Sequence, residues 1–110
     1  MKPTLLLFGL FLIFMGCKKT DSSVPGCIND KIGVFKRTTP CNDAKVDEYL
    51  FQNELVFVFD EGTCVVDGSS DVYNSSCKLI GSLGGFTGNM EIQGINFSEK
   101  AVFQKTIWKK

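Results

Sequence analysis

The apolar positions of the chain follow different patterns in successive segments. Residues 5–15 are apolar with no charged residue among them, and residues 18–26 are largely polar. Apolar residues then recur every three to four positions over residues 27–37, and from residue 44 the period changes to two. The first spacing is typical of an amphipathic helix and the second of a half-buried strand. The pattern therefore predicts a hydrophobic leader, a polar tether, one helix and a series of strands.

The predicted helix covers residues 27–37. Ile28, Ile32 and Phe35 lie at positions i, i+4 and i+7, so they share one helical face. The last turn is basic, which suits the negative end of the helix dipole. Pro40 follows and closes the segment.

A hairpin is expected next. From Ala44 the period changes to two, with one strand face carrying Val46, Glu48 and Leu50 and the other Asp47, Tyr49 and Phe51. Residues 55–59 form an unbroken β-branched and aromatic run. Residues 52–54 join the two as a turn. Because the second run lacks polar alternation, we expect it to be a central strand covered on both faces. Further short strands are expected at residues 64–66, 71–73, 77–80, 90–97 and 102–109.

These elements predict an α+β fold in which one N-terminal helix packs on a small antiparallel β-sheet stabilised by disulfides. Residues 27–110 are long enough for one small domain. Gly94 is expected to form a bulge in its strand, and residues 98–100 to turn the chain. In the final strand, strict alternation places four side chains on one face: Val102, Gln104, Thr106 and Trp108.

The N-terminal residues are typical of an export signal. Lys2 supplies a positive charge, residues 5–15 form the apolar stretch, and Gly16 is the small residue before the cleavage site. The apolar stretch is shorter than the roughly 20 residues that a membrane-spanning helix needs. We therefore predict a signal peptide over residues 1–16.

Cys17 is the predicted site of lipidation. Residues 13–17 resemble the lipobox of bacterial lipoproteins, in the looser form found in Bacteroidota. The resemblance implies that Cys17 becomes the mature N-terminus and carries a diacylglycerol thioether and an amide-linked acyl chain such as palmitate. Several acyl chains anchor a protein stably, whereas one anchors only marginally. The alternative is ordinary secretion, with Cys17 left as a thiol.

The lipid would place the protein in the cell envelope, with residues 17–26 as lipidated cysteine and tether. Lys18 and Lys19 follow the cysteine. They differ from the acidic run that resembles a surface-export signal, so we expect the periplasmic face of the outer membrane rather than the cell surface. The mature part is close to neutral, because only Lys2 among the 12 basic and 12 acidic residues lies in the leader. No nucleic-acid partner is expected, since such proteins carry clustered basic residues.

Four further cysteines are expected to form two disulfides in the oxidising envelope: Cys27, Cys41, Cys64 and Cys77. Four cysteines allow three pairings. A helix over residues 27–37 is about 15 Å long, so Cys41 barely returns to Cys27, and the helix favours pairing of Cys27 with Cys64 or Cys77. A metal site is not expected, because the chain has no histidine and no C-x-x-C motif.

A glycine-rich loop is expected over residues 81–89, and its centre is the first place to look for a binding site: Gly84, Gly85, Phe86, Thr87 and Gly88. Such glycines can bring backbone N–H groups close to an anion. A phosphate loop would also need a following lysine, which is missing here. The favoured interpretation is a connecting loop in which the glycines take positive φ around a buried Phe86.

Candidates for catalysis are few. The absence of histidine excludes triad and histidine-based acid–base chemistry. Asp60 and Asp71 are the carboxylate pair that could act on a glycoside, and an oxygen-rich cluster that adds Glu61 and Asp67 could hold Ca²⁺. Turn chemistry explains these acidic residues equally well. We expect no enzymatic activity, no catalytic residue and no cofactor.

The chain from Cys27 onwards resembles a family of small uncharacterised lipoprotein domains of Bacteroidota, a domain of unknown function. The resemblance rests on Cys27-Ile28 with Lys31-Ile32 and Phe35, the aromatic hairpin at residues 49–59, the Cys64 region, residues 73–77, the loop at residues 84–88 and the ending Thr106-Ile107-Trp108. The family carries an adjacent cysteine pair near Cys64, where this chain has Val65. The resemblance implies a fold and a location in the cell envelope, and it implies no activity.

The sequence therefore predicts a non-enzymatic binding or accessory module of the envelope. Its expected partners are the membrane, through the lipid on Cys17, and an envelope protein or glycan. Asp47, Tyr49 and Phe51 share one strand face, and if that face is exposed it would be a binding patch for a protein or glycan. The alternative is an inhibitor of a periplasmic or foreign hydrolase, which needs a rigid exposed loop. Residues 81–89 or 67–76 would supply that loop.

Overall fold

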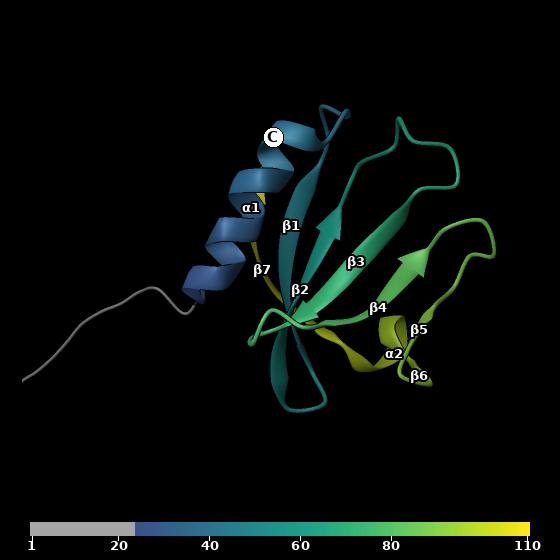
Figure 1. Ribbon diagram of the computed structural model, residues 1–110. Helices are drawn as coiled ribbons and strands as arrows, with labels where there is room; N and C mark the ends of the chain where they lie inside the picture. The colour runs from purple at the N-terminus through teal and green to yellow at the C-terminus, as the bar shows by residue number, and fades with distance from the viewer. Residues whose placement is uncertain (1–23) are drawn as a thin grey trace, which may run out of the picture.

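The computed structural model describes residues 24–110 (Figure 1). The predicted signal peptide at residues 1–16 and the predicted lipidation at Cys17 lie outside the described residues, so both stay predictions.

The described chain forms a five-stranded antiparallel sheet with helices on its two faces (Figure 1). The strand order is β4-β3-β2-β1-β7, and β5 and β6 form a separate two-stranded sheet. This arrangement confirms the predicted α+β fold. The elements are α1 (Gly26–Thr38), β1 (Lys45–Phe51), β2 (Glu54–Asp60), β3 (Ser69–Asn74), β4 (Leu79–Gly84), β5 (Glu91–Ile92), β6 (Ile95–Asn96), α2 (Phe97–Lys100) and β7 (Val102–Lys109).

Helix α1 agrees with the predicted helix to within one residue at each end. Ile28 and Ile32 are buried, and Phe35 packs beside them. The helix ends where the backbone N–H of Thr39 donates to the carbonyl oxygen of Phe35. Pro40 then prevents continuation. The apolar stripe read from the sequence is therefore the face that packs on the sheet.

Strand β2 is central and buried on both faces, as its unbroken apolar run predicts. Phe57 and Phe59 pack toward α1, whereas Val56 and Val58 pack in a second cluster on the opposite face. All four side chains are at most 8% exposed. The strand therefore joins two apolar layers, one under α1 and one under α2 with β5 and β6.

The second layer differs from the sequence prediction in its connections. Residues 90–97 do not form one extended segment with a bulge. Instead, β5 and β6 make a short hairpin whose turn residues, Gln93 and Gly94, both have positive φ. The expected turn at residues 98–100 is part of helix α2, because the side chain of Asn96 accepts a hydrogen bond from the backbone N–H of Glu99 and caps the helix.

The face of β1 predicted as a candidate aromatic patch is covered. Phe51 is 3% exposed and Asp47 is 5% exposed. The rings of Tyr49 and Phe51 pack on Phe97 of α2, and their centroids lie 5.1 and 4.9 Å from the centroid of the Phe97 ring. The condition for a binding patch on this face, that it be exposed, is therefore not met, because α2 returns over this side of the sheet.

Strand β7 occupies the predicted residues but does not alternate strictly. Two register shifts against β1 place Trp108 opposite Val46 and Thr106 opposite Asp47. Neighbouring residues of β1 point to opposite faces, so Thr106 and Trp108 do not share a face as predicted. Trp108 lies on the α1 side, where its ring is 5.8 Å from that of Phe35.

Candidate binding surface

The four predicted cysteines form two disulfides within the described chain. Cys27 pairs with Cys77 and Cys41 pairs with Cys64, with Cα atoms 6.2 and 5.5 Å apart. The pairing agrees with the helix-length argument and decides between the partners that it left open for Cys27. The first bridge attaches the start of α1 to the β3–β4 turn, and the second attaches the α1–β1 connection to the β2–β3 loop.

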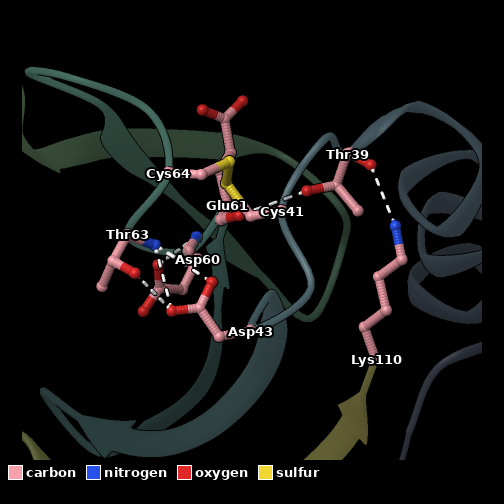
Figure 2. Close-up of a disulfide and its surroundings, with 9 residues drawn as sticks. Thr39, Cys41, Asp43, Asp60, Glu61, Thr63, Cys64 and Lys110 are labelled. Carbon is pink, nitrogen blue, oxygen red and sulfur yellow. Dashed lines mark hydrogen bonds between the residues drawn. A yellow bond between two sulfur atoms is a disulfide. The ribbon is translucent and has the colours of Figure 1, made fainter.

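The Cys41–Cys64 bridge is reinforced by a carboxylate next to it (Figure 2). Asp43 accepts hydrogen bonds from the side-chain hydroxyl of Thr63 at 2.6 Å and from its backbone N–H at 3.1 Å. These two bonds, the hydroxyl first, lower the pKa of the Asp43 carboxyl. Asp60 accepts a further bond from the backbone N–H of Gly62 at 2.9 Å. The first half of the β2–β3 loop is therefore held at several points.

The same region ties the end of the chain to the end of α1 (Figure 2). The Thr39 hydroxyl donates to the carbonyl oxygen of Glu61, and the ammonium of Lys110 donates to the carbonyl oxygen of Thr39, each at 3.2 Å. The strand predicted at residues 64–66 does not form. The Cys41–Cys64 disulfide and the Asp43–Thr63 bonds hold that segment in a loop beyond the sheet.

The second half of the β2–β3 loop is a tight turn over Val65–Gly68. The backbone N–H of Gly68 donates to the carbonyl oxygen of Val65 at 3.4 Å, and Asp67 has a positive φ of 55°. Val66 is at the outer corner of this turn and its side chain is 88% exposed. Sequence reasoning missed this residue, although an apolar side chain directly before Asp67-Gly68, a turn dipeptide, is a detectable signal.

The predicted binding loop forms a second tight turn. Gly84 and Asn89 exchange two backbone hydrogen bonds of 2.7 and 3.0 Å, and inside them Gly88 donates to the carbonyl oxygen of Gly85 at 3.1 Å. The three glycines, at 84, 85 and 88, have positive φ, which confirms the expected backbone conformation. Residues 81–84, expected in the loop, belong to strand β4.

Phe86 is at the outer corner of this second turn and is 88% exposed. The expectation of a buried Phe86 is wrong, because the Gly85–Gly88 turn closes with its own hydrogen bond and leaves nothing to cover the ring. Thr87 follows it in the turn. The side-chain amide of Asn89 braces the base of the turn, donating to the carbonyl oxygens of Ser82 and Glu91 at 2.7 and 2.8 Å.

The two turns are joined directly. The backbone N–H of Gly85 donates to the carbonyl oxygen of Gly68 at 3.0 Å. We call the Val65–Gly68 and Gly85–Gly88 turns together the two-turn tip. Each turn presents its second residue, Val66 or Phe86, to solvent. The result is a pair of exposed apolar side chains on a hydrogen-bonded support.

The acidic residues predicted as catalytic or calcium-binding candidates do not converge. Asp60 continues the Val56–Val58 face of β2, whereas Asp71 lies opposite Phe59 and so points to the other face of the sheet. Asp71 accepts a hydrogen bond from the Ser82 hydroxyl at 2.7 Å. Within residues 24–110, no group of three or more acidic or cysteine side chains is arranged to hold a metal ion.

Comparison with known proteins adds one match. A family model described as a domain of unknown function covers residues 34–110. No curated protein and no solved structure matches the chain. In the part of the chain that the structure describes, no helix is long and apolar enough to cross a membrane.

Proposed function

The chain belongs to the DUF6970 family, a domain of unknown function, and we propose its role from its own sequence and structure. The proposed role is that of a lipid-anchored envelope protein that binds a partner protein through the two-turn tip. The proposal is a non-enzymatic binding module. Membership in the family supplies no activity, so the support comes from the N-terminal sequence and from the geometry of the tip.

The proposed location in the cell envelope is based on the N-terminal sequence and the cysteines. Residues 1–16 have the layout of an export signal, and Gly16-Cys17 ends it as a lipobox does. The two disulfides support export independently, because disulfides persist in oxidising compartments and are rare in the cytosol. An outer-membrane lipoprotein of the kind found in Bacteroidota is consistent with both.

The position of the tip supports an outward-facing binding surface. The chain enters α1 beside the β3–β4 turn, to which the Cys27–Cys77 bridge attaches it. The two-turn tip lies at the other end of β3 and β4 (Figure 1). Strand β3 has six residues, which corresponds to about 20 Å. A lipid on Cys17 would therefore hold the start of α1 near the membrane and leave the tip directed away from it.

The observation that carries the proposal is the exposure of Val66 and Phe86. Both side chains are 88% exposed. The backbone bond between Gly85 and Gly68 joins the two turns that carry them. Apolar side chains gathered on one surface mark interaction sites, and buried aromatic anchors contribute much of the energy of protein interfaces. The hydrogen-bonded turns keep the ordering cost of binding low, since the tip loses little freedom on association.

Site-specific photocrosslinking tests the binding surface. The full-length lipidated chain is expressed in its own host with benzoylphenylalanine in place of Phe86. A matched chain carries it in place of Phe103, which is 53% exposed on β7. We expect a protein adduct from position 86 that is missing from position 103. Equal adducts from both positions, or adducts to lipid or glycan alone, would contradict the proposed protein-binding tip.

The proposed anchor has a separate test. The intact mass of the membrane-extracted protein should include the lipid on Cys17 and rise by about four daltons when its two disulfides are reduced. Cys17→Ala should release the protein from the membrane fraction. Continued membrane association of an unlipidated chain would overturn the anchor and leave the binding surface unaffected.

A hydrolase inhibitor is the second candidate function, and the Cys41–Cys64 bridge favours it. The bridge braces the β2–β3 loop directly before Val65 and Val66, which gives a protruding loop held by a disulfide. In that case the crosslinked partner is a hydrolase, and one equivalent of the mature chain abolishes its activity. Val66→Asp should relieve the inhibition. A partner whose activity does not change would exclude this candidate.

A further inference from the structure

A groove follows the border between α1 and the sheet, on the side of β2 and β3. Its volume is about 240 Å³. Four of its lining residues share one stripe of α1 at positions i, i+3, i+4 and i+7, and two come from the strands below. They are Lys31, Val34, Phe35, Thr38, Phe59 and Tyr73. The groove is separate from the two-turn tip.

The walls of the groove are mainly apolar. The Phe59 ring packs edge to face with Phe35 and with Tyr73, each at a centroid distance of 5.3 Å. Val34 is 51% exposed along the helical side. From Lys31 to Thr38 the stripe runs about 10 Å along the helix, given the rise of 1.5 Å per residue. The groove therefore offers an elongated apolar surface that α1 and the sheet leave partly open.

The two ends of the groove differ in charge. At one end, the ammonium of Lys31 lies 4.5 Å from the centroid of the Tyr73 ring. Among residues 24–110, no carboxylate is within salt-bridge distance of this ammonium. At the other end, the Thr38 hydroxyl donates to the carbonyl oxygen of Val34 at 3.1 Å and satisfies its own helix. The Lys31 end thus has a positive charge with no ionic partner among residues 24–110. At the Thr38 end, the hydroxyl hydrogen is already used within the helix.

We propose that this groove binds a small amphiphilic anion, with its carboxylate or similar head group on Lys31 and its apolar body along Val34, Phe35 and Phe59. Charge complementarity selects the head group, because the Lys31 ammonium gains an ionic partner that residues 24–110 do not supply. The aromatic and aliphatic walls favour an apolar ligand body, because such a body would remove their exposed apolar surface from water. This site is independent of the proposed protein-binding tip, and either can be true without the other.

Octanoate is a suitable probe. The mature chain with Cys17→Ala carries no lipid that competes for the groove, and its backbone amides are followed by NMR as octanoate is added. We expect saturable shifts at Lys31, Val34 and Tyr73, and about tenfold weaker binding of octanol, which lacks the charge. Absence of saturable shifts, or equal binding of octanol, would overturn the proposal.

Two lysine variants isolate the charge. Lys31→Met keeps the apolar stem and removes the ammonium, and should weaken octanoate binding about tenfold. Lys36 is an exposed residue of the same helix outside the groove, so Lys36→Met should leave the affinity for octanoate unchanged. A Val34→Asp variant places a negative charge among the apolar walls and should abolish binding. Unchanged affinity in Lys31→Met, or an equal loss in both lysine variants, would contradict the assigned site.

Discussion

The backbone N–H of Gly85 donates a 3.0 Å hydrogen bond to the carbonyl oxygen of Gly68. This bond joins the β2–β3 loop to the β4–β5 turn, two segments that each present an almost fully exposed apolar side chain. Gly84 brings them close enough, because a Cβ atom built on it would lie 3.3 Å from the same Gly68 oxygen. Small residues at this junction therefore hold Val66 and Phe86 on one common support.

Gly84→Ala should destabilise the domain by about 1–2 kcal/mol, because an L-residue is strained at positive φ. Gly84 has φ +79° and its new Cβ would press on the Gly68 carbonyl oxygen. Urea unfolding of wild type and variant measures the difference. Gly33→Ala is the matched control. Gly33 lies within α1 with open space around it, so this variant should be more stable than wild type by about 0.5–1 kcal/mol. A stable Gly84→Ala would mean that the turn adopts another conformation in solution.

Two phenylalanines should respond oppositely to truncation. Phe57 is fully buried, whereas Phe86 is 88% exposed. Phe57→Ala should cost about 3–5 kcal/mol, because it opens a cavity in the core. Phe86→Ala should change stability by less than about 0.5 kcal/mol, since it touches little of the fold. Chemical denaturation tests both, and a large loss for Phe86→Ala would indicate that its ring packs against the protein.

Both disulfides should stabilise the domain, and the one closing the longer loop should contribute more. Cys27–Cys77 spans 50 residues and Cys41–Cys64 spans 23. From the loop entropy of the unfolded chain, removing them should cost about 4 and about 3.5 kcal/mol respectively. Paired Cys→Ala variants in urea measure the two values. A loss below about 1 kcal/mol for either pair would show that the bridge does not constrain the unfolded chain as expected.

Asp43 should make stability depend on pH at acidic values. Hydrogen bonds from the hydroxyl and then from the N–H of Thr63 lower its pKa below the usual 3.8. The stabilisation is therefore present above pH 3.8 and is lost as the pH falls through the lower folded-state pKa. NMR titration of the Asp43 carboxyl carbon measures the pKa directly. Thr63→Val removes the hydroxyl and should move the pKa back upward, and an unchanged titration would show that this bond is not formed.

Glu48 is a point of weakness in the sheet. It is 4% exposed, and its Oε1 atom has no hydrogen-bond partner among the described residues. Glu48→Met should raise stability by about 1 kcal/mol, because it removes a buried polar atom without opening a cavity. Glu54→Met, at an exposed position in β2, should change stability little. If Glu48→Met instead destabilises the protein, the Glu48 carboxylate is paired in solution, and Lys105, opposite it in β7, is the cross-strand candidate.

Local sequence patterns were sufficient for most of the regular structure. The spacing of Ile28, Ile32 and Phe35 predicted α1, and the change to alternation from residue 44 predicted the β1–β2 hairpin. These patterns work because helix and strand periods depend on neighbouring side chains and a single buried face. The predicted strand at residues 64–66 was wrong, because the Cys41–Cys64 bridge and the Asp43–Thr63 bonds hold that segment outside the sheet.

The candidate site was predicted only in part. The glycines at 84, 85 and 88 pointed to the correct loop and to positive φ. The exposure of Phe86 and the whole contribution of Val66 were missed, since exposure depends on what covers a side chain. Nothing local to Phe86 distinguishes an aromatic ring that packs inward from one that stands in solvent.

The sequence by itself determined the helix, the central strand and the presence of four cysteines suited to two bridges. Tertiary structure alone decided which cysteines pair, how β7 is shifted against β1, and that the two exposed turns meet at Gly68 and Gly85. The physical reason is the separation of the contacting residues along the chain. Helix and strand preferences act between residues a few positions apart, whereas these contacts join residues 17 to 64 positions apart and form only when the whole sheet assembles.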